Sequence, residues 1–289
     1  MQPVEIGIIG GSGLYAMAAL TEREEIALDT PFGAPSDSLT VGTLAGRRVA
    51  FVPRHGRGHR LNPSEVPYRA NIHALKQLGA RFVLGVTAVG SLREELVPGH
   101  FVVPDQAIDR TKGIRPASFF SDGIVGHVAF ADPVCPELAR IVAAAARASS
   151  GTTVHEGGTY CCMEGPQFST RAESELYRAW GCSIIGMTLL PEAKLAREAE
   201  LSYASLSLVT DYDCWYPDHA SVTAAMVMET IGRNVAAAQA TIATAVEMID
   251  PAAVYPAHSA TRHALMTAPE KISPETRARL HLLLGGAEI

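Results

Sequence analysis

The sequence predicts a single α/β domain in which helices flank a central sheet. Strand-like and helix-like segments alternate along the 289-residue chain, and no repeat or clear domain boundary interrupts them. The run from Phe82 to Leu92 is continuously apolar, which is typical of a central parallel strand covered on both faces. We therefore assign residues 1–289 to one domain, with residues 251–289 as a C-terminal extension that contains several prolines.

The first elements follow from apolar runs and turn residues. Residues 4–9 form an apolar strand that enters Gly10-Gly11-Ser12-Gly13, where glycines allow backbone N–H groups to face an anion. Residues 39–44 and 48–52 are expected to form a hairpin closed at Ala45-Gly46-Arg47. Asn62 or Ser64 then caps a helix that ends at Gly79, and its apolar stripe consists of Tyr68, Ile72, Leu75 and Leu78.

The same alternation continues in the second half of the chain. Residues 101–103 read as a strand, residues 115–136 as an irregular segment and residues 138–148 as an alanine-rich helix. A strand from Tyr160 runs into a turn, and Thr170 with Glu173 forms a capping box for the next helix. The later elements are a strand at 183–188, a helix that begins at Pro191, a strand at 203–210, a long helix at 223–249 and a short helix near 277–284.

Composition and charge limit the possible functions. The net charge is −6 with no basic block, which argues against nucleic-acid binding. The 5 cysteines are odd in number and lack paired spacing, so neither a disulfide framework nor a zinc site is expected, and a reducing, cytoplasmic location is favoured. We expect no signal peptide, because the N-terminus lacks a basic region before a long apolar run. We also expect no membrane span, because no segment approaches the roughly 20 apolar residues that one requires.

Two carboxylates stand at the exit of a buried strand. The apolar residues Leu208 and Val209 lead into Asp211 and Asp213, which would share one face if the strand continued. Ligands of α/β domains bind at the carboxyl ends of strands. Two acids this close raise each other's pKa, so one can donate to N7 of adenine while the other accepts from the amino group. The alternative is a strand end capped by two solvated acids.

A basic loop follows the predicted hairpin. Residues 53–60 bring three arginines and two histidines together between glycines. Arginine forks match phosphate oxygens, and histidine adds a second donor, although a solvated surface loop has the same composition. His55 and His59 have the spacing of a zinc pair on a helix, but Gly56 and Gly58 disfavour a helix there.

The glycine turn near the N-terminus also fits a dinucleotide fingerprint, Gly11-x-Gly13-x-x-Ala16. A second strand that ends in an acid should follow it closely. Residues 29–35 form a Pro/Gly loop instead, so a nicotinamide cofactor is disfavoured. A non-catalytic nucleotide-binding module remains one alternative function for this turn.

Several stretches in a fixed order resemble the trimeric purine nucleoside phosphorylase and methylthioadenosine phosphorylase family over residues 4–250. They are residues 8–14, Arg54-His55-Gly56, residues 68–72, residues 87–95, residues 164–174, Gly186-Met187-Thr188 with Pro191-Glu192, and residues 210–215. The Asp-Tyr-Asp-Cys-Trp stretch is similar to the methylthioadenosine branch in particular. The 6-oxopurine branch has Asn where Asp211 stands.

The resemblance implies a mixed, twisted central sheet and a role for each matching residue. Phosphate would be bound by Ser12, Arg54, His55, Thr87, Thr188 and the backbone near Ala88. Met187 would pack on the ribose, Phe168 would line the base pocket, and Asp211 and Asp213 would bind the base. His127 matches a position that reaches the 5′ substituent from a neighbouring subunit. Thr223, Met226 and Val227 fall near the apolar 5′ wall. Residues 251–289 are less alike; in the family this region helps to line the same pocket, so the extension is expected to close it without an assigned residue.

The resemblance also implies a reaction, a set of partners and an assembly. The reaction is phosphorolysis of S-methyl-5′-thioadenosine to adenine and 5-methylthioribose 1-phosphate, in purine and methionine salvage. Inorganic phosphate is the co-substrate, and no metal or organic cofactor is expected. The assembly would be a homotrimer, or a hexamer built as a dimer of trimers. Phosphorolysis of 6-oxopurine nucleosides or of methylthioinosine is the alternative reaction, which Asp211 argues against.

Overall fold

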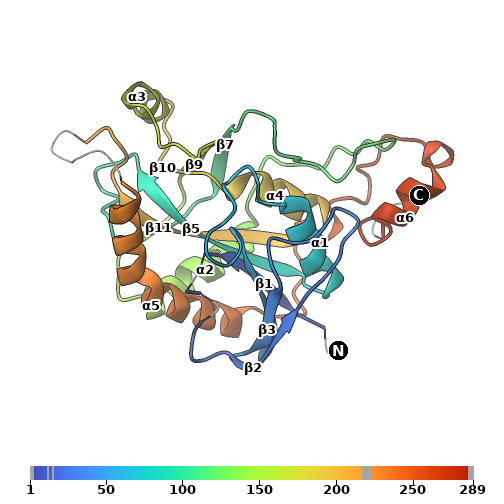
Figure 1. Ribbon diagram of the computed structural model, residues 1–289, viewed down its shortest axis with the longest axis horizontal. Helices are drawn as coiled ribbons and strands as arrows, with labels where there is room; N and C mark the ends of the chain where they lie inside the picture. The colour runs from blue at the N-terminus through green and yellow to red at the C-terminus, as the bar shows by residue number, and fades with distance from the viewer. Residues whose placement is uncertain (1–2, 12, 15, 217–222, 286–289) are drawn as a thin grey trace.

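A computed structural model describes residues 3–11, 13–14, 16–216 and 223–285, and it contains one large mixed sheet with helices on both faces (Figure 1). The strands are β1 (Ile6–Gly10), β2 (Thr21–Ile26), β3 (Leu39–Leu44), β4 (Arg47–Pro53), β5 (Phe82–Ser91), β6 (Phe101–Val103), β7 (Gln106–Arg110), β8 (Val154–Glu156), β9 (Thr159–Met163), β10 (Ile184–Gly186) and β11 (Ser202–Asp211). The helices are α1 (Tyr68–Gln77), α2 (Pro136–Ser149), α3 (Arg171–Ala179), α4 (Leu189–Glu198), α5 (Ala224–Met248) and α6 (Pro274–Leu280), with short 3₁₀ turns at Pro256–Ser259 and Pro269–Lys271.

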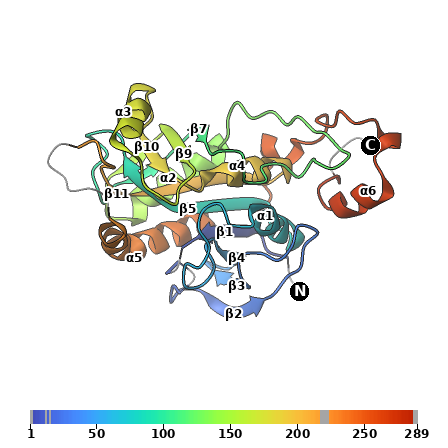
Figure 2. The same ribbon diagram turned by 45° about the horizontal axis from the view of Figure 1, so that its top comes forward.

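Strand β5 is the centre of the sheet, as its apolar sequence predicts. Its side chains alternate between two cores: Val83 packs with α1 and α4 on one face, and Leu84 packs with α2 and α5 on the other. Figure 2 shows α1 and α5 on different sides of β5. The sheet order is β2-β3-β4-β1-β5-β10-β9-β7, and β11, β6 and β8 join it through β5.

One edge of β5 changes partners partway along the strand. Its first residues, Phe82 to Gly85, pair with β1 in parallel, whereas Gly90 and Ser91 pair with β10 in the antiparallel direction. Residues 86–89 lie between these two partners, while β11 pairs with the other edge throughout. Such a switch point is where an open α/β sheet forms a crevice.

Several local predictions are confirmed and others are wrong. The capping box of Thr170 and Glu173 is present at α3, and regular helix in α4 begins at Pro191 because Leu190 is not helical. Neither Asn62 nor Ser64 caps α1, whose N-cap is Pro67; the Asn62 side chain instead accepts from backbone N–H groups in the preceding turn. Strands β2, β7 and β8 were not predicted, because their sequences are polar and short.

The C-terminal segment after α5 packs against the loop that precedes α2. Gly126 bridges to Leu265, and the Val125 N–H donates to the Thr267 hydroxyl at 2.9 Å. Both views place α6 on the opposite side of the molecule from α3 (Figures 1 and 2). None of the described helices is long and apolar enough to cross a bilayer.

Candidate active site

A cavity of about 570 Å³ opens at the switch point of β5. This volume lies within the usual range for small-molecule sites. Most of the residues predicted for the site line it: Arg54, His55, Thr87, Ala88, Phe168, Met187, Thr188, Asp211, Asp213 and Val227. They come from segments that are far apart in the sequence, and β5 runs beneath them from Val86 to Gly90. These two residues are separated by about 13 Å of extended strand, which suits the length of a nucleoside with a phosphate below its sugar.

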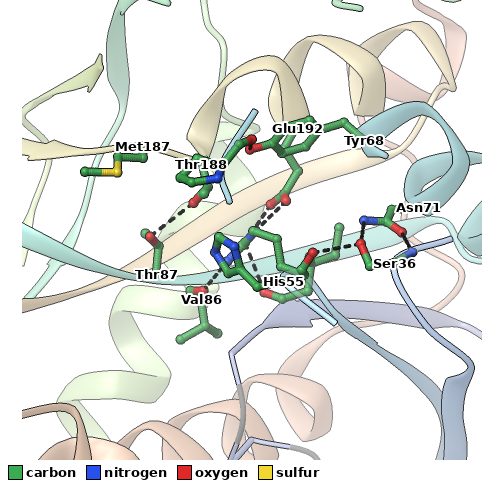
Figure 3. Close-up of polar contacts among 12 residues, drawn as sticks. Ser36, His55, Tyr68, Asn71, Val86, Thr87, Met187, Thr188 and Glu192 are labelled. Carbon is green, nitrogen blue, oxygen red and sulfur yellow. Dashed lines mark hydrogen bonds and ion pairs between the residues drawn. The ribbon is translucent and has the colours of Figure 1, made fainter. Parts of the chain in front are cut away.

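Arg54 is a buried, charged group at one end of this cavity. Its guanidinium is 3% exposed and forms a two-point ion pair with Glu192 at 2.8 and 2.9 Å, and it also donates to the Val86 carbonyl at 2.8 Å (Figure 3). Glu192 accepts a further hydrogen bond from the Tyr203 hydroxyl at 2.9 Å. The pKa of Arg54 is raised because the attraction of Glu192 outweighs burial, so the guanidinium stays charged. The result is a rigid group that has little freedom to reorient.

Hydroxyl groups and an imidazole complete this end of the cavity. The Thr87 and Thr188 hydroxyls lie 3.3 Å apart (Figure 3), and His55, which follows Arg54 in the chain, also lines the cavity. His55 Nδ1 is 2.9 Å from the Leu61 carbonyl, and its ring stacks on His59 at 4.3 Å. Burial and the nearby Arg54 charge lower the pKa of His55 to about 4. An anion here would therefore meet two hydroxyls, the fixed cation of Arg54 and a His55 ring that is neutral near pH 7.

The basic loop divides into two parts with different surroundings. Arg54, His55, His59 and Arg60 line the cavity, whereas Arg57 forms ion pairs with Asp37 and Glu25. An anion site formed by this loop stays a prediction, and these four residues lie on the cavity wall where it would form.

The two acids at the other end of the cavity are buried. Asp211 is 9% exposed and Asp213 is 5% exposed. Burial raises the pKa of both groups, and in Asp211 the charge of Asp213 adds a smaller increase while hydrogen bonds from Thr210 and the Asp213 N–H oppose it. The sequence interpretation invoked mutual repulsion between the two acids, but loss of hydration is the larger cause.

The two acids are positioned by a β-bulge and a turn, and not by the alternation of side chains along a continued strand. The pairing of β11 with β5 shifts register between Val209 and Asp211, the strand ends at Asp211, and Asp213 has a positive φ of 52°. The Asp213 N–H donates to Asp211 Oδ1 at 2.8 Å. A side chain at Gly90 would place its Cβ only 2.9 Å from that same oxygen, so glycine gives Asp211 its space.

One oxygen of the acid pair indicates what this end of the cavity could bind. Among the described residues, Asp213 Oδ2 is buried without a hydrogen-bond partner. A buried acceptor of this kind costs free energy unless a ligand supplies a donor. Phe168, 43% exposed, lines the cavity with Asp213 and offers an aromatic face. The geometry suits a planar heterocycle that carries a donor group.

Residues that follow β11 hold the acid pair in position. The Trp215 indole donates to the Ser91 carbonyl at 2.7 Å, the Arg178 guanidinium lies 3.5 Å from the centre of the Trp215 ring, and the Tyr212 hydroxyl donates to the Glu94 carbonyl at 3.1 Å. These contacts tie the segment to the end of β5 and to α3, so the acids do not depend on strand pairing alone.

Four predicted site residues fall outside the described cavity wall. His127 is exposed on the loop before α2, where its N–H donates to the Ala264 carbonyl at 2.8 Å, and Thr223 is exposed just before α5. Ser12 and the Met226 side chain lie outside the described residues, although Gly11, next to Ser12, lines the cavity. No described residue after Ile231 lines the cavity, so the described part of the extension, residues 251–285, does not reach it within its own chain.

Two buried ion pairs near the cavity were not predicted as site features. Glu192 fixes Arg54, and its one signal was a single acid in the otherwise apolar stretch 189–193. Arg115 pairs with Glu164 at 3.2 Å and donates to the carbonyls of Met187 and Leu190 at 2.5 and 3.1 Å. It comes from the segment that the sequence marks only as irregular, so nothing in its local pattern could reveal this role.

Known proteins resemble this chain over almost its whole length. The phosphorylase superfamily model matches residues 5–247. The S-methyl-5′-thioadenosine phosphorylase of Chloroflexus aurantiacus is 58% identical over 285 residues, which cover 99% of both chains, and that of Gloeobacter violaceus is 55% identical over 96% of this chain and 94% of its own.

Solved structures agree with the sequence relatives. A methylthioadenosine phosphorylase from an antarctic soil metagenomic library superposes with a TM-score of 0.94 at 51% identity, covering 98% of this chain and 100% of its own. The Schistosoma mansoni methylthioadenosine phosphorylase in complex with adenine superposes with a TM-score of 0.82 at 36% identity, covering 98% of both chains. The chain therefore belongs to the phosphorylase superfamily and, within it, to the S-methyl-5′-thioadenosine phosphorylases.

Proposed function

We infer that the protein catalyses phosphorolysis of S-methyl-5′-thioadenosine to adenine and 5-methylthioribose 1-phosphate, and so serves purine and methionine salvage. Relatives of that name, 51–58% identical over nearly the full length, support this activity. The observation that carries the assignment of roles is the acid pair: the pKa of Asp211 is raised by burial, and an Asp213 oxygen is buried without a partner among the described residues.

The base would be recognised by these two acids in complementary states. Asp211, kept protonated, would donate to N7, and Asp213 would accept from the 6-amino group, which supplies the donor that Oδ2 lacks. Phe168 would pack against the purine ring. Proton donation to N7 lets adenine leave as a neutral molecule, and general-acid catalysis of this kind contributes about 10²–10⁴ in rate.

Phosphate would bind at the opposite end of the cavity, below the sugar. Arg54, His55, Thr188 and the backbone at Ala88 would hold it, with Thr87 between phosphate and ribose and Met187 against the sugar. The bond from the sugar to the purine breaks with its electrons going to the base, and a phosphate oxygen forms the new bond to the anomeric carbon. Orientation of this anion would supply much of the rate. Ser12 keeps its proposed phosphate role by family likeness alone.

The 5′ substituent would be bound partly across a subunit interface. Val227 lines the cavity, and Thr223 and Met226 are its neighbours in the chain. His127 and the described residues 251–285 do not line the cavity of their own chain, so their proposed contacts with the 5′ group require a neighbouring subunit. A homotrimer, or a dimer of trimers, would provide it. We place the protein in the cytoplasm, where its five free thiols would remain reduced.

A panel of nucleosides tests the proposed reaction directly. Purified protein is incubated with methylthioadenosine, adenosine, inosine and methylthioinosine, each with and without saturating phosphate, and released base is measured. Adenine release from methylthioadenosine that depends on phosphate supports the proposal. Turnover of inosine or methylthioinosine alone would indicate a 6-oxopurine enzyme, and binding without turnover would indicate a non-catalytic module.

A further inference from the structure

The phosphate end of the cavity has little net charge. Arg54 is its buried cation, and Glu192, whose side chain is 1% exposed, balances that charge at 2.8 Å. The remaining Arg54 bonds go to the carbonyls of Val86 and Ile9 at 2.8 and 3.2 Å. A guanidinium has five N–H donors, and these contacts with Glu192, Val86 and Ile9 engage four of them. A dianion in this site therefore depends on the groups around Arg54 for much of its binding.

His55 is the group whose protonation state matters most there. The Leu61 carbonyl, 2.9 Å from Nδ1, can only accept, so Nδ1 carries a hydrogen. Nε2 has no hydrogen-bond partner among the residues that the structure describes, and the ring lines the cavity.

Three charged or titratable groups near His55 disfavour a second proton on the ring. They are Arg54 beside it in the chain, His59 stacked on it, and Arg115. Burial is the largest cause that lowers the pKa of His55 to about 4; these three groups act in the same direction, and the bond to the Leu61 carbonyl opposes them. Arg60 and Glu65, which also line the cavity, are of opposite charge. In neutral solution Nε2 is therefore unprotonated, and its lone pair can accept a hydrogen bond.

We propose that His55 Nε2 accepts a hydrogen bond from the hydroxyl of hydrogen phosphate, so that the co-substrate binds as HPO₄²⁻ together with its own proton. This rests on the proposed function, since it concerns the phosphate of that reaction. The unprotonated oxygens face donors: the last Arg54 N–H and the Thr87 and Thr188 hydroxyls, which lie 3.3 Å apart. His55 thus acts as the acceptor in a site that otherwise donates.

The proton balance of the reaction follows. An unprotonated phosphate oxygen forms the bond to the anomeric carbon, the electrons of the broken bond go to the base, and Asp211 supplies the proton that the base needs. The proton shared with His55 stays on the phosphoryl group, which leaves as a sugar phosphate monoanion. Asp211 is reprotonated from solvent, where the product loses its proton.

Sulfate is the probe that tests this arrangement, because it matches phosphate in shape and charge but carries no proton. To bind in the same way, sulfate must bring one proton from solvent to His55. Between roughly pH 8 and pH 9, where free phosphate is mostly HPO₄²⁻, the Kd of phosphate should stay constant. The inhibition constant of sulfate should rise about tenfold per pH unit over the same range. Calorimetry in buffers of different ionisation enthalpy should show proton uptake with sulfate and none with phosphate.

His55→Ala should remove this difference and leave both anions with the same flat pH dependence. His59→Ala is the matched control, since it deletes the stacked ring and leaves the Nε2 acceptor of His55 in place; its two anions should still differ. Equal tenfold slopes for phosphate and sulfate in the unaltered protein would overturn the proposal, because both would then bind to a protonated His55. Equal flat slopes would overturn it as well. A protein that binds both anions but releases no adenine with phosphate would refute the proposed function and leave the proton count measurable.

Discussion

The two ends of the cavity differ in how completely a single chain builds them. At the phosphate end, Arg54 and Glu192 are almost fully buried and their hydrogen bonds are made within the chain. At the end proposed for the base and the 5′ substituent, Phe168 is 43% exposed and Met228 on α5 is 58% exposed, although both line the cavity. The end proposed for phosphate is thus formed by buried groups of one chain, whereas the end proposed for the nucleoside leaves Phe168 and Met228 exposed.

The difference follows from where the residues come from. Arg54 enters from the end of β4, Glu192 from α4 and Val86 from β5, so three central elements converge on the phosphate end. The end proposed for the base and the 5′ substituent depends on the start of α5 and on Phe168 in the loop before α3. Elements of the sheet are packed on two faces, whereas a helix terminus and a turn have fewer neighbours to fix them.

The largest effect is expected from breaking the buried ion pair at the preformed end. Arg54→Met leaves Glu192 buried and uncompensated, which should lower the free energy of unfolding by about 3–5 kcal/mol and abolish phosphate-dependent adenine release. Denaturant unfolding and the base-release assay measure the two effects.

Arg60→Met is the matched control for Arg54→Met. Arg60 also lines the cavity, but its side chain is 57% exposed, so its loss should change unfolding by less than about 0.5 kcal/mol. If both variants were equally stable, the ion pair would not be what makes the phosphate end rigid.

The next largest effect is expected from Asp211→Asn, which should alter the proposed base site and leave the proposed phosphate site intact. Asp211→Asn keeps the shape of the side chain but removes the proton that passes to N7, so turnover of 6-amino purine nucleosides should fall by about 10²–10⁴. Relative activity on 6-oxopurine nucleosides should rise, because an amide suits a 6-keto group. The Kd of phosphate should stay unchanged in this variant. An unaltered ratio of inosine to methylthioadenosine turnover would contradict the proposed role in base recognition.

The raised pKa of Asp211 also predicts that kcat/KM and the free energy of unfolding depend on pH, with a smaller effect than the substitution. Burial raises the pKa of Asp211 above 3.8, and the protonated form is the active one, so kcat/KM should decline as pH rises through the raised value. For stability the sign is the same: the folded state holds this proton more tightly, so its contribution is fully present below about pH 4 and is lost as pH rises. Asp211→Asn should therefore gain stability relative to the unaltered protein with increasing pH. A constant difference in unfolding free energy would show that the acid is not perturbed.

The sequence predicts the fold better than it predicts the contacts that position the site residues. Apolar runs and helical periodicity indicate β5, α2 and α5 because burial selects those residues, whereas β2, Thr-Glu-Arg-Glu-Glu-Ile, is an almost fully exposed edge strand and carries no such pattern. The sequence also marks Asp211 and Asp213 as a pair, but their placement depends on a bulge and a positive φ that spacing alone does not reveal.

Partners that are distant in the chain explain the rest of what the sequence could not predict. The basic loop indicates a cation for phosphate, but the acid that fixes Arg54 is 138 residues away and no local pattern joins them. His127 entered through family likeness alone. In the structure His127 does not line the cavity of its own chain, and the part of the cavity that it would complete is the part that a single chain leaves exposed.

The smallest effect is expected from His127→Ala. The side chain is exposed, so its loss should leave stability almost unchanged, and it should mainly raise the KM for nucleosides with a 5′-alkylthio group while kcat and the Kd of phosphate stay the same. If the residue acts from a neighbouring subunit, mixing His127→Ala with the inactive Asp211→Asn variant should restore part of the lost affinity, because some mixed sites pair an intact Asp211 with an intact His127. Each variant alone at the same total concentration is the control. An increase in KM without rescue in the mixture would place the contact within one chain, and the open end of the cavity would then have to close by movement of its own loops.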